Sequence, residues 1–591
     1  MDIIARIQEV VNSQIRKLYS KEFSAELIRV YPAKAEHAHD FSIPVFPFAK
    51  LIGGNPMEIA EKISGAISES NDLFHSCEGK AGYLNLTLQN AAWLGFVKEI
   101  LSGKNYGYHQ PNGKNTMVEY CGPNTNKPLH LGHLRNVVIG FSVAEILKAA
   151  GHRVVKANMI NDRGIHICRS MLSYQKFGNG ETPSSRGIKG DHLIGEYYVR
   201  FEKELKKQIA GLVATGMTEE EAKKEAPLQK EIQQMLLDWE AGKKEVKELW
   251  KLMNGWVYEG FAETFNRIGI DFDKNYYESE TYLLGKKMVE DGLMKNIFFK
   301  KPDGSVWINL TEEKLDEKLV LRADGTSVYI TQDLGTADLK WSDYHCEHSV
   351  YVVATEQDYH FKVLQAICKK LGRPYAPGIY HLSYGMVDLP SGRMKSREGT
   401  VVDADELITE MESTAEVHTK ELGKTEGFTE EELKILYHTI AMGALKFYLL
   451  RVDPKKKMIF NPEESIDFHG YTGPFIQYAH ARIKSILRRI EPSSNELMSD
   501  VPLHCAERKL LIEIALFPRV ILESADALNP AIVVNYVFQL AQTFNSFYGE
   551  VSVLKAESDS LRKWRRQLCE ATGMVLASGM KLAGITAPER M

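Results

Sequence analysis

One stretch of this chain constrains its fold more than any other, because it predicts a strand, a helix and a second strand in close succession. The segments are T-M-V-E-Y-C at Thr116–Cys121, an apolar run at Leu131–Ala150, and R-V-V-K-A-N-M at Arg153–Met159. This succession is a βαβ unit, which requires a parallel sheet with the helix packed on one face. Ligands of open parallel sheets bind beyond the carboxyl ends of the strands, so we expect the chemistry just after Glu119 and Tyr120.

The rest of the chain is predicted to form further domains around this unit. At about 150 residues per domain, a length of 591 residues predicts three to five domains. We expect a small α+β domain over residues 1–110, a parallel-sheet α/β domain over residues 111–410, and an all-helical domain over residues 411–591. Residues from about 195 to 265 are charged and rich in Lys, Glu, Leu and Gln, which predicts a helical insertion. The predicted class is multidomain α/β.

Apolar periodicity predicts further elements. Ile, Val and Leu at helical spacing predict an amphipathic helix over residues 2–20, and alternation predicts a strand over Gly82–Leu88, followed by a helix to about Gly103. Later strands are expected at S-V-W-I-N-L from Ser305, at S-V-Y-I from Ser327, and at V-Y-V-V-A from Val350.

Charge and cysteine content exclude several classes of protein and site. The formal net charge of −5 is no basic excess, so any RNA contact must come from local patches. The seven cysteines form no C-x-x-C pair and are an odd number, so they suggest neither a disulfide framework nor a zinc ribbon, and a reducing compartment fits best. His345, Cys346 and His348 lie close together without a second ligand pair, so we interpret them as a loop and expect no resident metal. We also expect a cytoplasmic protein without a membrane segment, because no run of 18 apolar residues occurs.

The residues that open the predicted helix indicate a phosphate site. P-L-H-L-G-H at Pro128–His133 places two imidazoles at a helix N-terminus, where free N–H groups and the helix dipole favour an anion. Gly132 leaves room for a nucleotide to approach, and Lys127 adds a positive charge. N–H groups of His130 and His133 can donate to phosphate oxygens as charge develops during displacement at phosphorus. The alternative interpretation is two polar residues at the start of a surface helix.

A longer string around these histidines resembles the first signature motif of class I aminoacyl-tRNA synthetases, in the version of the arginyl-tRNA synthetase family. The string is V-E-Y-C-G-P-N-T-N-K-P-L-H-L-G-H-L-R-N. Further matches are D-G-T-S-V-Y-I-T-Q-D-L-G-T-A from Asp324, E-Q-D-Y-H-F from Glu356, H-L-S-Y-G-M-V from His381, Q-Y-A-H-A-R from Gln477, and the terminal A-P-E-R-M. The resemblance covers the whole chain. It implies a Rossmann-like catalytic domain, an N-terminal domain that contacts tRNA and a helical C-terminal bundle that binds the anticodon.

The second class I motif, K-M-S-K-S, has an eroded counterpart in this chain. G-R-M-K-S-R-E-G at Gly392–Gly399 offers only Lys395 in the lysine role. The resemblance implies that Lys127, before the first motif, substitutes for the missing lysine. It also implies that ATP is bound by His130, Gly132, His133, Gly385, Met386, Val387 and Lys395. Without the family, the loop is typical of a solvated basic turn.

The amino-acid pocket is predicted from the chemistry of arginine and from the resemblance. Arginine presents a planar, permanently charged fork of donors, so a selective pocket needs carboxylates placed for bidentate hydrogen bonds, a geometry that lysine cannot reproduce. The resemblance implies that Asp333 and Glu278 bind the guanidinium, with Tyr329 packing against the same end. It implies that the α-amino and α-carboxylate groups are bound by Glu119, Asn124 and Gln357. Without the family, Asp or Tyr at a strand end is more often a structural cap.

Basic clusters in the C-terminal part are candidate RNA contacts. A helix predicted over Phe475–Ile490 has one apolar face and one basic face, and further clusters lie at Lys455–Lys457 and around Trp564. Trp564 offers an aromatic face for base stacking. The basic residues are Arg482, Lys484, Arg488 and Arg489 in the helix and Arg562, Lys563, Arg565 and Arg566 beside Trp564. A solvated helix face is an equally good interpretation.

Together, these residues predict a ligase that activates L-arginine with ATP and transfers it to tRNA(Arg), with His130, His133, Lys127 and Lys395 as catalytic groups. ATP is a substrate, Mg²⁺ is expected to accompany its phosphates, and the expected state is a monomer. One alternative is a non-catalytic tRNA-binding paralogue, motivated by the eroded loop. Another is a different class I nucleotidylyltransferase or a synthetase for another amino acid, which should lack the paired Asp333 and Tyr329.

Overall fold

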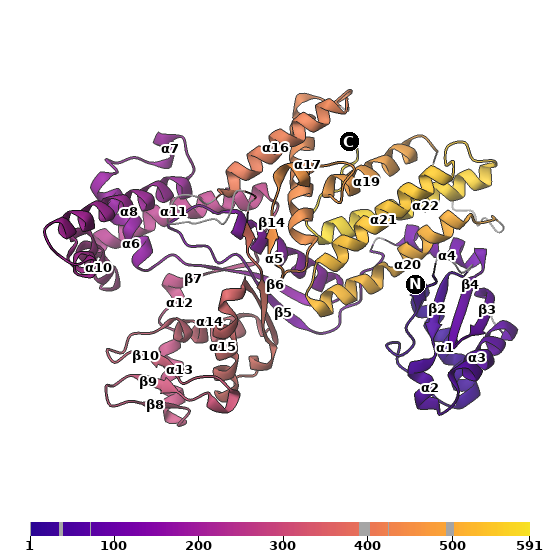
Figure 1. Cartoon of the computed structure of the whole chain (residues 1–591), viewed down its shortest axis with the longest axis horizontal. Helices are drawn as coiled ribbons and strands as arrows, with labels where there is room; N and C mark the ends of the chain where they lie inside the picture. Colours follow the sequence, from indigo (N-terminus) through magenta and orange to yellow (C-terminus); the bar gives the residue numbers. More distant parts are fainter. Residues whose placement is uncertain are drawn as a thin grey trace.

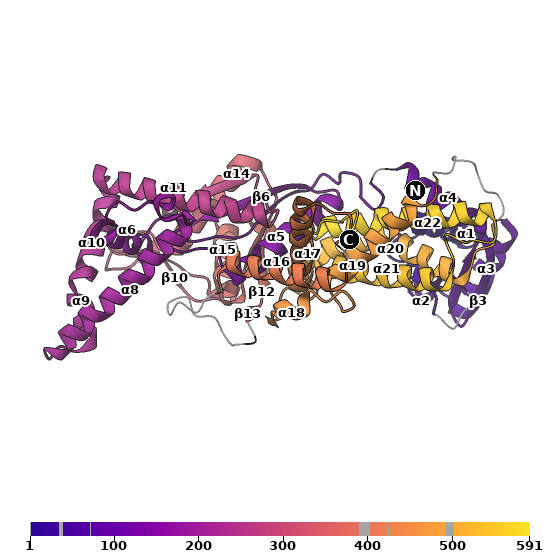
Figure 2. The same ribbon diagram turned by 90° about the horizontal axis from the view of Figure 1, so that it is seen from above.

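A computed structural model describes residues 2–34, 39–70, 72–103, 105–388, 390, 402–423, 425–491 and 501–591. The molecule is elongated (Figures 1 and 2). The N-terminal sheet lies at one end and a group of helices from the middle of the chain lies at the other. The largest sheet lies between them, beside the C-terminal bundle (Figure 1). The predicted boundaries at residues 110 and 410 stay a prediction.

The central sheet has five strands, all parallel, in the order β12-β11-β5-β6-β7. The strands are β5 (Asn115–Glu119), β6 (Arg153–Ile160), β7 (Lys274–Tyr277), β11 (His348–Ala354) and β12 (Ile379–Tyr384). Helix α5 (Leu131–Ala149) crosses from β5 to β6, which confirms the predicted βαβ unit and the strand from Val350. The chain adds β6 and β7 on one side of β5 and β11 and β12 on the other. This reversal makes the end of β5 a switch point, where such sheets bind ligands.

The N-terminal part is an antiparallel sheet with helices, as expected for an α+β domain. Its strands are in the order β1-β2-β4-β3: β1 (Tyr31–Pro32), β2 (Phe41–Pro44), β3 (Phe74–Lys80) and β4 (Tyr83–Leu88). Its helices are α1 (Ile3–Tyr19), α2 (Phe46–Ile52), α3 (Pro56–Ser70) and α4 (Asn90–Ser102). Ile3, Ile7, Val11 and Ile15 form the buried face of α1. The predictions of a helix at residues 2–20, a strand at Gly82–Leu88 and the following helix are confirmed.

Between β6 and β7 the chain leaves the sheet and forms helices. They are α6 (Ile165–Phe177), α7 (Pro183–Arg186), α8 (Gly190–Ala214), α9 (Glu219–Glu225), α10 (Pro227–Glu240) and α11 (Lys244–Arg267). Helices therefore fill the range of about 195–265, and they begin earlier, at Ile165. We call α6–α11 the helical insert; it forms one end of the molecule (Figure 1).

A second excursion separates β7 from β11. It contains α12 (Glu278–Thr281), α13 (Gly285–Met294) and an antiparallel sheet of β8 (Phe298–Lys300), β9 (Val306–Ile308) and β10 (Lys318–Leu321), with the short 3₁₀ segment η1 (Thr311–Glu313). Helix α14 (Tyr329–Tyr344) leads into β11. The 3₁₀ segment η2 (Thr355–Gln357), helix α15 (Asp358–Lys370) and η3 (Ala376–Gly378) join β11 to β12.

The strand predicted at S-V-Y-I from Ser327 is wrong, because helix α14 begins at Tyr329. The β-branched and aromatic residues favour a strand locally. Ile330, Leu334 and Ala337 are nevertheless all buried, at the i, i+4, i+7 spacing of one helix face. Tertiary packing therefore overrides the local preference at this position. The strand predicted from Ser305 is present as β9.

The described C-terminal part is helical apart from two short strands that pair with each other. Its elements are β13 (Val387–Asp388), α16 (Ala404–Glu421), α17 (Glu430–Leu450), β14 (Met458–Ile459), α18 (Pro462–Ser465), α19 (Gly473–Arg488), α20 (Cys505–Ala527), α21 (Ala531–Glu550) and α22 (Asp559–Leu582). Among the described residues, α17 is the one helix long and apolar enough to cross a membrane, and 72% of that stretch is buried inside the protein. Core helices of globular proteins have this property.

The structure corrects the interpretation of the cluster around Trp564. Trp564 is fully buried on α22, so its ring is not available for base stacking. Arg565 and Arg566 are also buried, and their guanidinium groups pair with acidic residues of the bundle. The pairs are Arg565 with Glu507 and Glu557, and Arg566 with Glu570. On α19, in contrast, Ile476, Ala479, Ile483 and Ile486 are buried as predicted.

The N-terminal sheet is held to the bundle by a buried acidic group. The carboxylate of Asp40 accepts hydrogen bonds from the Leu88 N–H at 2.8 Å, the Trp93 indole at 3.2 Å and Arg508 Nη1 at 3.0 Å. Arg508 lies on α20 and also donates to Asn90 Oδ1 at 2.5 Å. Two distant parts of the chain therefore share one desolvated charge pair, which is costly to break from one side only.

We expect Arg508→Ala to weaken this docking by about 3 kcal/mol, because it leaves the Asp40 carboxylate buried without its cation. Amide hydrogen exchange in β4 and α20 would measure the loss as increased local opening. Arg519→Ala is the matched control, since Arg519 lies on the same helix and donates to the Val30 carbonyl at 2.7 Å. Its loss should cost about 1 kcal/mol. Equal exchange in the two variants would contradict the role of Asp40.

Candidate active site

The predicted site residues follow the carboxyl ends of the central strands. Glu119 ends β5 and Glu278 comes directly after β7, while Gln357 and Gly385 follow β11 and β12. Asn124 forms a bridge with Asn161, just beyond the end of β6. The carboxyl edge of the sheet is therefore the candidate active site, where the βαβ unit predicted it.

The backbone at the start of α5 fixes the two signature histidines. His130 is the N-cap, and its Nδ1 accepts from the Gly132 N–H at 3.1 Å. The His130 N–H in turn donates to His133 Nδ1 at 3.2 Å. The imidazole rings lie with their centroids 3.9 Å apart. Because each Nδ1 is an acceptor, each neutral ring carries its proton on Nε2, and both rings present N–H donors.

The surroundings keep both histidines neutral. Burial, together with the nearby charge of Lys127, lowers the pKa of His130 to about 3. Burial also holds the pKa of His133 well below its usual value, with His130 and Lys127 acting in the same direction. The Lys127 ammonium has its own pKa lowered by burial. Two neutral donors and one cation thus stand at the positive end of a helix, an arrangement that suits an anion with several oxygens.

Helix α5 is tied to neighbouring segments by Arg135 and Asn136. The Arg135 side chain is fully buried and donates to three backbone carbonyls, those of Met386 at 3.2 Å, Pro454 at 3.2 Å and Lys456 at 2.6 Å. Asn136 accepts from the Cys121 N–H at 2.6 Å and donates to the Val352 carbonyl at 2.8 Å. The predicted ATP segment that includes Met386 therefore lies against the same helix as the histidines.

Gly385 must be glycine at this contact. A Cβ on Gly385 would lie 2.6 Å from the backbone of Lys456, and the Gly385 N–H donates to the Pro454 carbonyl at 2.9 Å.

The turn after β5 is also constrained, because Cys121 has a φ of +80°, a conformation that residues other than glycine rarely adopt. Asn136 holds the N–H of that residue. Backbone strain of this kind concentrates at functional sites.

A cavity of about 770 Å³ lies between α5 and the helical insert. Its wall includes Lys127, His130 and Asn124, with His192 and basic side chains of α8 opposite. The basic side chains are Arg200, Lys203 and Lys207. The histidine pair thus borders a space large enough for a nucleotide or the end of a polynucleotide.

A second polar group lies beyond β7, where acidic residues outnumber cations. Asp162 accepts from the Ser279 N–H at 2.8 Å and from the Tyr258 hydroxyl at 2.9 Å. Burial raises the pKa of Glu278 to about 7; attraction to Arg163 opposes this rise, whereas repulsion from Asp162 and Asp333 adds to it. Within the described part of the chain, no cation pairs with the Glu278 carboxylate. This group is therefore a candidate site for a ligand cation.

Asp333 and Tyr329 share one face of α14, four residues apart, and α12 packs against this helix. Asp333 Oδ2 lies 2.5 Å from His360 Nε2. Tyr329 is exposed at the helix N-terminus, with 78% of its surface accessible. The charge of Asp333 contributes to the raised pKa of Glu278, which indicates that the two carboxyl groups lie in the same region.

The remaining predicted residues are placed less uniformly. The Glu119 carboxylate forms an ion pair with Lys340, a cation that the sequence did not suggest. Gln357 is exposed at the end of η2. Lys395 lies outside the described residues. Sequence reasoning also missed Arg135 and His360, although both lie inside the strings quoted above, L-H-L-G-H-L-R-N and E-Q-D-Y-H-F.

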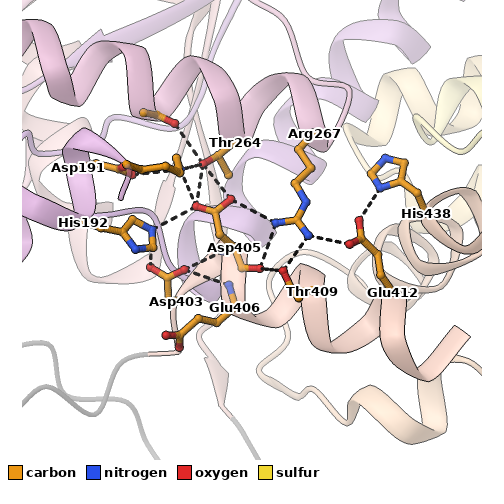
Figure 3. Close-up of polar contacts among 12 residues, drawn as sticks. Asp191, His192, Thr264, Arg267, Asp403, Asp405, Glu406, Thr409, Glu412 and His438 are labelled. Atoms are coloured by element: carbon orange, nitrogen blue, oxygen red, sulfur yellow. Dashed lines mark hydrogen bonds and ion pairs between the residues drawn. The ribbon is translucent and has the colours of Figure 1, made fainter. Parts of the chain in front are cut away.

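A polar network joins the start of α16 to the helical insert (Figure 3). Asp191, His192 and Asp405 come close enough to share a metal ion. The ammonium of Lys189, however, already lies 2.6 Å from Asp405 Oδ2 and 3.5 Å from Asp191 Oδ2. A lysine therefore supplies the positive charge at this position, and we assign no metal to it.

The tautomers of His130 and His133 give a direct prediction. In protein labelled with ¹⁵N-histidine, both rings should stay neutral and protonated on Nε2 from pH 8 down to pH 5, because the pKa of His130 is lowered to about 3 and that of His133 is also depressed. Spectra of His130→Asn and His133→Asn would assign the signals. Titration of either ring between pH 5 and pH 7 would contradict the geometry.

Three family models together match nearly the whole chain. The N-terminal domain of arginyl tRNA synthetase matches residues 5–88, the catalytic domain "tRNA synthetases class I (R)" matches residues 96–461, and the DALR anticodon binding domain matches residues 476–591. The arginine–tRNA ligase of Amoebophilus asiaticus is 51% identical over 596 residues and covers 100% of both chains. That of Flavobacterium psychrophilum is 50% identical and covers 99% of this chain and 100% of its own.

Solved structures agree on the fold. The arginyl-tRNA synthetase of Thermus thermophilus superposes with a TM-score of 0.81 over 100% of both chains, at 24% identity. The Plasmodium falciparum enzyme gives a TM-score of 0.76 at 20% identity, over 100% of this chain and 99% of its own. With the matching models and the close relatives, the predicted fold class is confirmed. This chain belongs to the arginyl-tRNA synthetases, ligases of class I.

Proposed function

We propose that the start of α5 stabilises the transition state in which arginine is activated by ATP. An arginine carboxylate oxygen attacks the α-phosphorus, the bond from this phosphorus to the bridging oxygen breaks, and pyrophosphate leaves with the electron pair. The Nε2–H groups of His130 and His133 and the ammonium of Lys127 stabilise the charge on the phosphate oxygens. Neutral donors do this without losing a proton, which suits a reaction that needs positioning more than covalent chemistry.

The observation that carries this proposal is the pair of backbone hydrogen bonds that fix both tautomers, from Gly132 to His130 and from His130 to His133. Gly132 supports it further, since a Cβ at that position would lie 3.0 Å from the His130 ring. We propose that Gly385, Met386 and Val387 line the nucleotide and that Lys395 joins Lys127 at the pyrophosphate. Nothing in the comparisons supports the alternative of a non-catalytic paralogue.

Mg²⁺ belongs to this proposal as the ion that accompanies ATP. The cavity wall offers Asp403 and Glu406, and Mg²⁺ in nucleotide sites is held by one or two carboxylates beside the phosphates. When bound, it neutralises charge on the leaving pyrophosphate.

We propose that Glu278 and Asp333 bind the guanidinium of the substrate. Glu278 is a half-buried carboxyl without a cation partner among the described residues, and burial raises its pKa to about 7. A planar guanidinium would supply it with two parallel hydrogen bonds. Tyr329 would cover the same end. Glu119, Asn124 and Gln357 are proposed for the α-amino and α-carboxylate end, where Lys340 pairs with one oxygen of Glu119 and the other oxygen would bind the ammonium.

In the second step, a ribose hydroxyl of the terminal adenosine of tRNA(Arg) attacks the carbonyl carbon of arginyl-adenylate, and AMP leaves. A pocket of about 360 Å³ on α19 supports tRNA binding by the bundle. Its wall carries three guanidinium groups and two aromatic rings, which suit an unstacked base and its phosphate. These are Arg482, Arg488, Arg590, Tyr478 and Phe428. The proposed enzyme is a cytoplasmic monomer that does not bind membranes.

Arginine-dependent exchange of pyrophosphate into ATP, with total tRNA present and with lysine and citrulline as competing amino acids, tests the proposal. We expect arginine to support exchange and lysine and citrulline not to support it. Asp333→Asn should lower kcat/KM for arginine about 10²-fold, because it leaves the substrate cation short of a partner. Asp316→Asn is a control, since Asp316 is an exposed carboxylate bonded to Tyr359. A loss of less than about threefold in Asp333→Asn would remove it from this role.

The pKa of Glu278 predicts how arginine binding depends on pH. Below pH 7 this carboxyl is increasingly protonated, because its pKa is raised to about 7, and a neutral carboxyl cannot pair with a guanidinium. The KM for arginine should therefore rise as the pH falls from 8 to 6, by up to about tenfold per unit below the pKa. Glu278→Gln should raise the KM at pH 8 and flatten this dependence. An unchanged pH profile in that variant would assign the titration to another group.

A further inference from the structure

We propose that Asp405 is a positioning residue, which holds the backbone of His130 in place by anchoring the segment Val402–Ala404 to the helical insert. The proposal rests on the role of His130 toward ATP given above. It adds a residue that touches neither arginine nor ATP, and it assigns a function to the network at the start of α16 (Figure 3).

The first link is the contact between this segment and the signature motif. The Leu131 N–H donates to the Val402 carbonyl at 3.2 Å, and the Ala404 N–H donates to the Leu129 carbonyl at 3.0 Å. Asp403 lies opposite His130 in this short antiparallel bridge. The backbone on either side of His130 is therefore held by the residues that open α16, in addition to its own cap.

The second link is the anchor of Asp405 in the helical insert. Its carboxylate accepts from Lys189 at 2.6 Å, from the Thr264 hydroxyl at 3.1 Å and from His192 at 3.3 Å, and these residues lie on or beside α8 and α11. Arg267 donates to the Asp405 backbone carbonyl at 3.2 Å. The carboxylate is therefore held by a lysine, a hydroxyl and an imidazole of the helical insert at once.

His192 joins the two links. Its Nε2 lies 3.3 Å from Asp405 Oδ2 and 3.4 Å from Asp403 Oδ2. Asp403 is the N-cap of α16, and its other oxygen accepts from the N–H groups of Asp405 and Glu406. One imidazole therefore contacts both the anchor and the residue opposite His130, and it lines the same cavity as His130.

The network also contains a part that does not reach the signature motif. Two turns further along α16, Glu412 pairs with Arg267 at 2.7 Å and with His438 at 2.7 Å (Figure 3). The pair of Glu412 and Arg267 joins α16 to α11, the same two helices that Asp405 joins. A substitution of Glu412 therefore measures what a contact between these helices contributes when it does not reach the signature motif.

The test compares Asp405→Asn with Glu412→Gln in the full chain, by arginine-dependent pyrophosphate exchange with tRNA present. Both variants remove one carboxylate of α16 that faces Arg267. Asp405→Asn should lower kcat about tenfold and leave the KM for arginine within about twofold, because the guanidinium pocket is untouched. Glu412→Gln should keep kcat within about twofold. Equal losses of kcat in the two variants would make the network structural and overturn the proposal.

A second variant covers the case in which Asp405→Asn unfolds, because that change removes the charge that pairs with the Lys189 ammonium at 2.6 Å. His192→Gln removes only the half-exposed member, so the thermal midpoint should stay near that of the wild type while kcat falls about threefold. Wild-type kcat in His192→Gln, or in a folded Asp405→Asn, would overturn the proposal. His130→Ala in the same assay separates the two proposals: full activity there would instead refute the role of His130.

Discussion

The N-terminus of α5 is the constraint on which the rest of the site depends. Four segments meet there. Asn136 holds the turn after β5, Arg135 holds the carbonyls of residue 386 and of residues 454 and 456, and residues 402–404 form a bridge. The two histidines add the helix's own cap. Each contact satisfies backbone groups that burial would otherwise leave without partners. Because these contacts fix the backbone at the start of α5, they also fix the orientation of the two imidazoles.

Charge is distributed differently at the two ends of the site. At the histidines, burial disfavours protonation, so the proposed phosphate site consists of neutral donors, a helix terminus and Lys127. Beyond β7, carboxyl groups are gathered with too few cations, and burial raises the pKa of Glu278 to about 7. Removing these polar groups from water costs free energy during folding, and a bound ligand of the opposite charge offsets that cost. Each half of the proposed site is therefore matched in charge to one of its proposed ligand groups before any ligand arrives.

The sequence predicted those features that local patterns encode. Apolar periodicity was enough for α1, α5 and the strands beside it, and the resemblance supplied the family. Local patterns failed where a distant partner decides the outcome. The segment from Ser327 has strand-forming residues, but its buried face follows helical spacing, and Arg565 of the basic cluster beside Trp564 pairs with Glu507, 58 residues away. The hydrogen bonds of Arg135 could not be predicted for the same reason, since nothing in the sequence distinguishes a buried arginine from an exposed one.

The Arg135 contacts also determine when the site can form. Their acceptors lie 251, 319 and 321 residues further along the chain. During synthesis, β5, α5 and β6 can pair early, but the Arg135 guanidinium does not have all three acceptors until the chain has passed residue 456. Loop closure over such distances is slow, and exposed strand edges favour aggregation meanwhile. The same contacts that make the finished site rigid therefore make its folding late, and a chain that ends before residue 454 lacks two of the three carbonyls that hold Arg135.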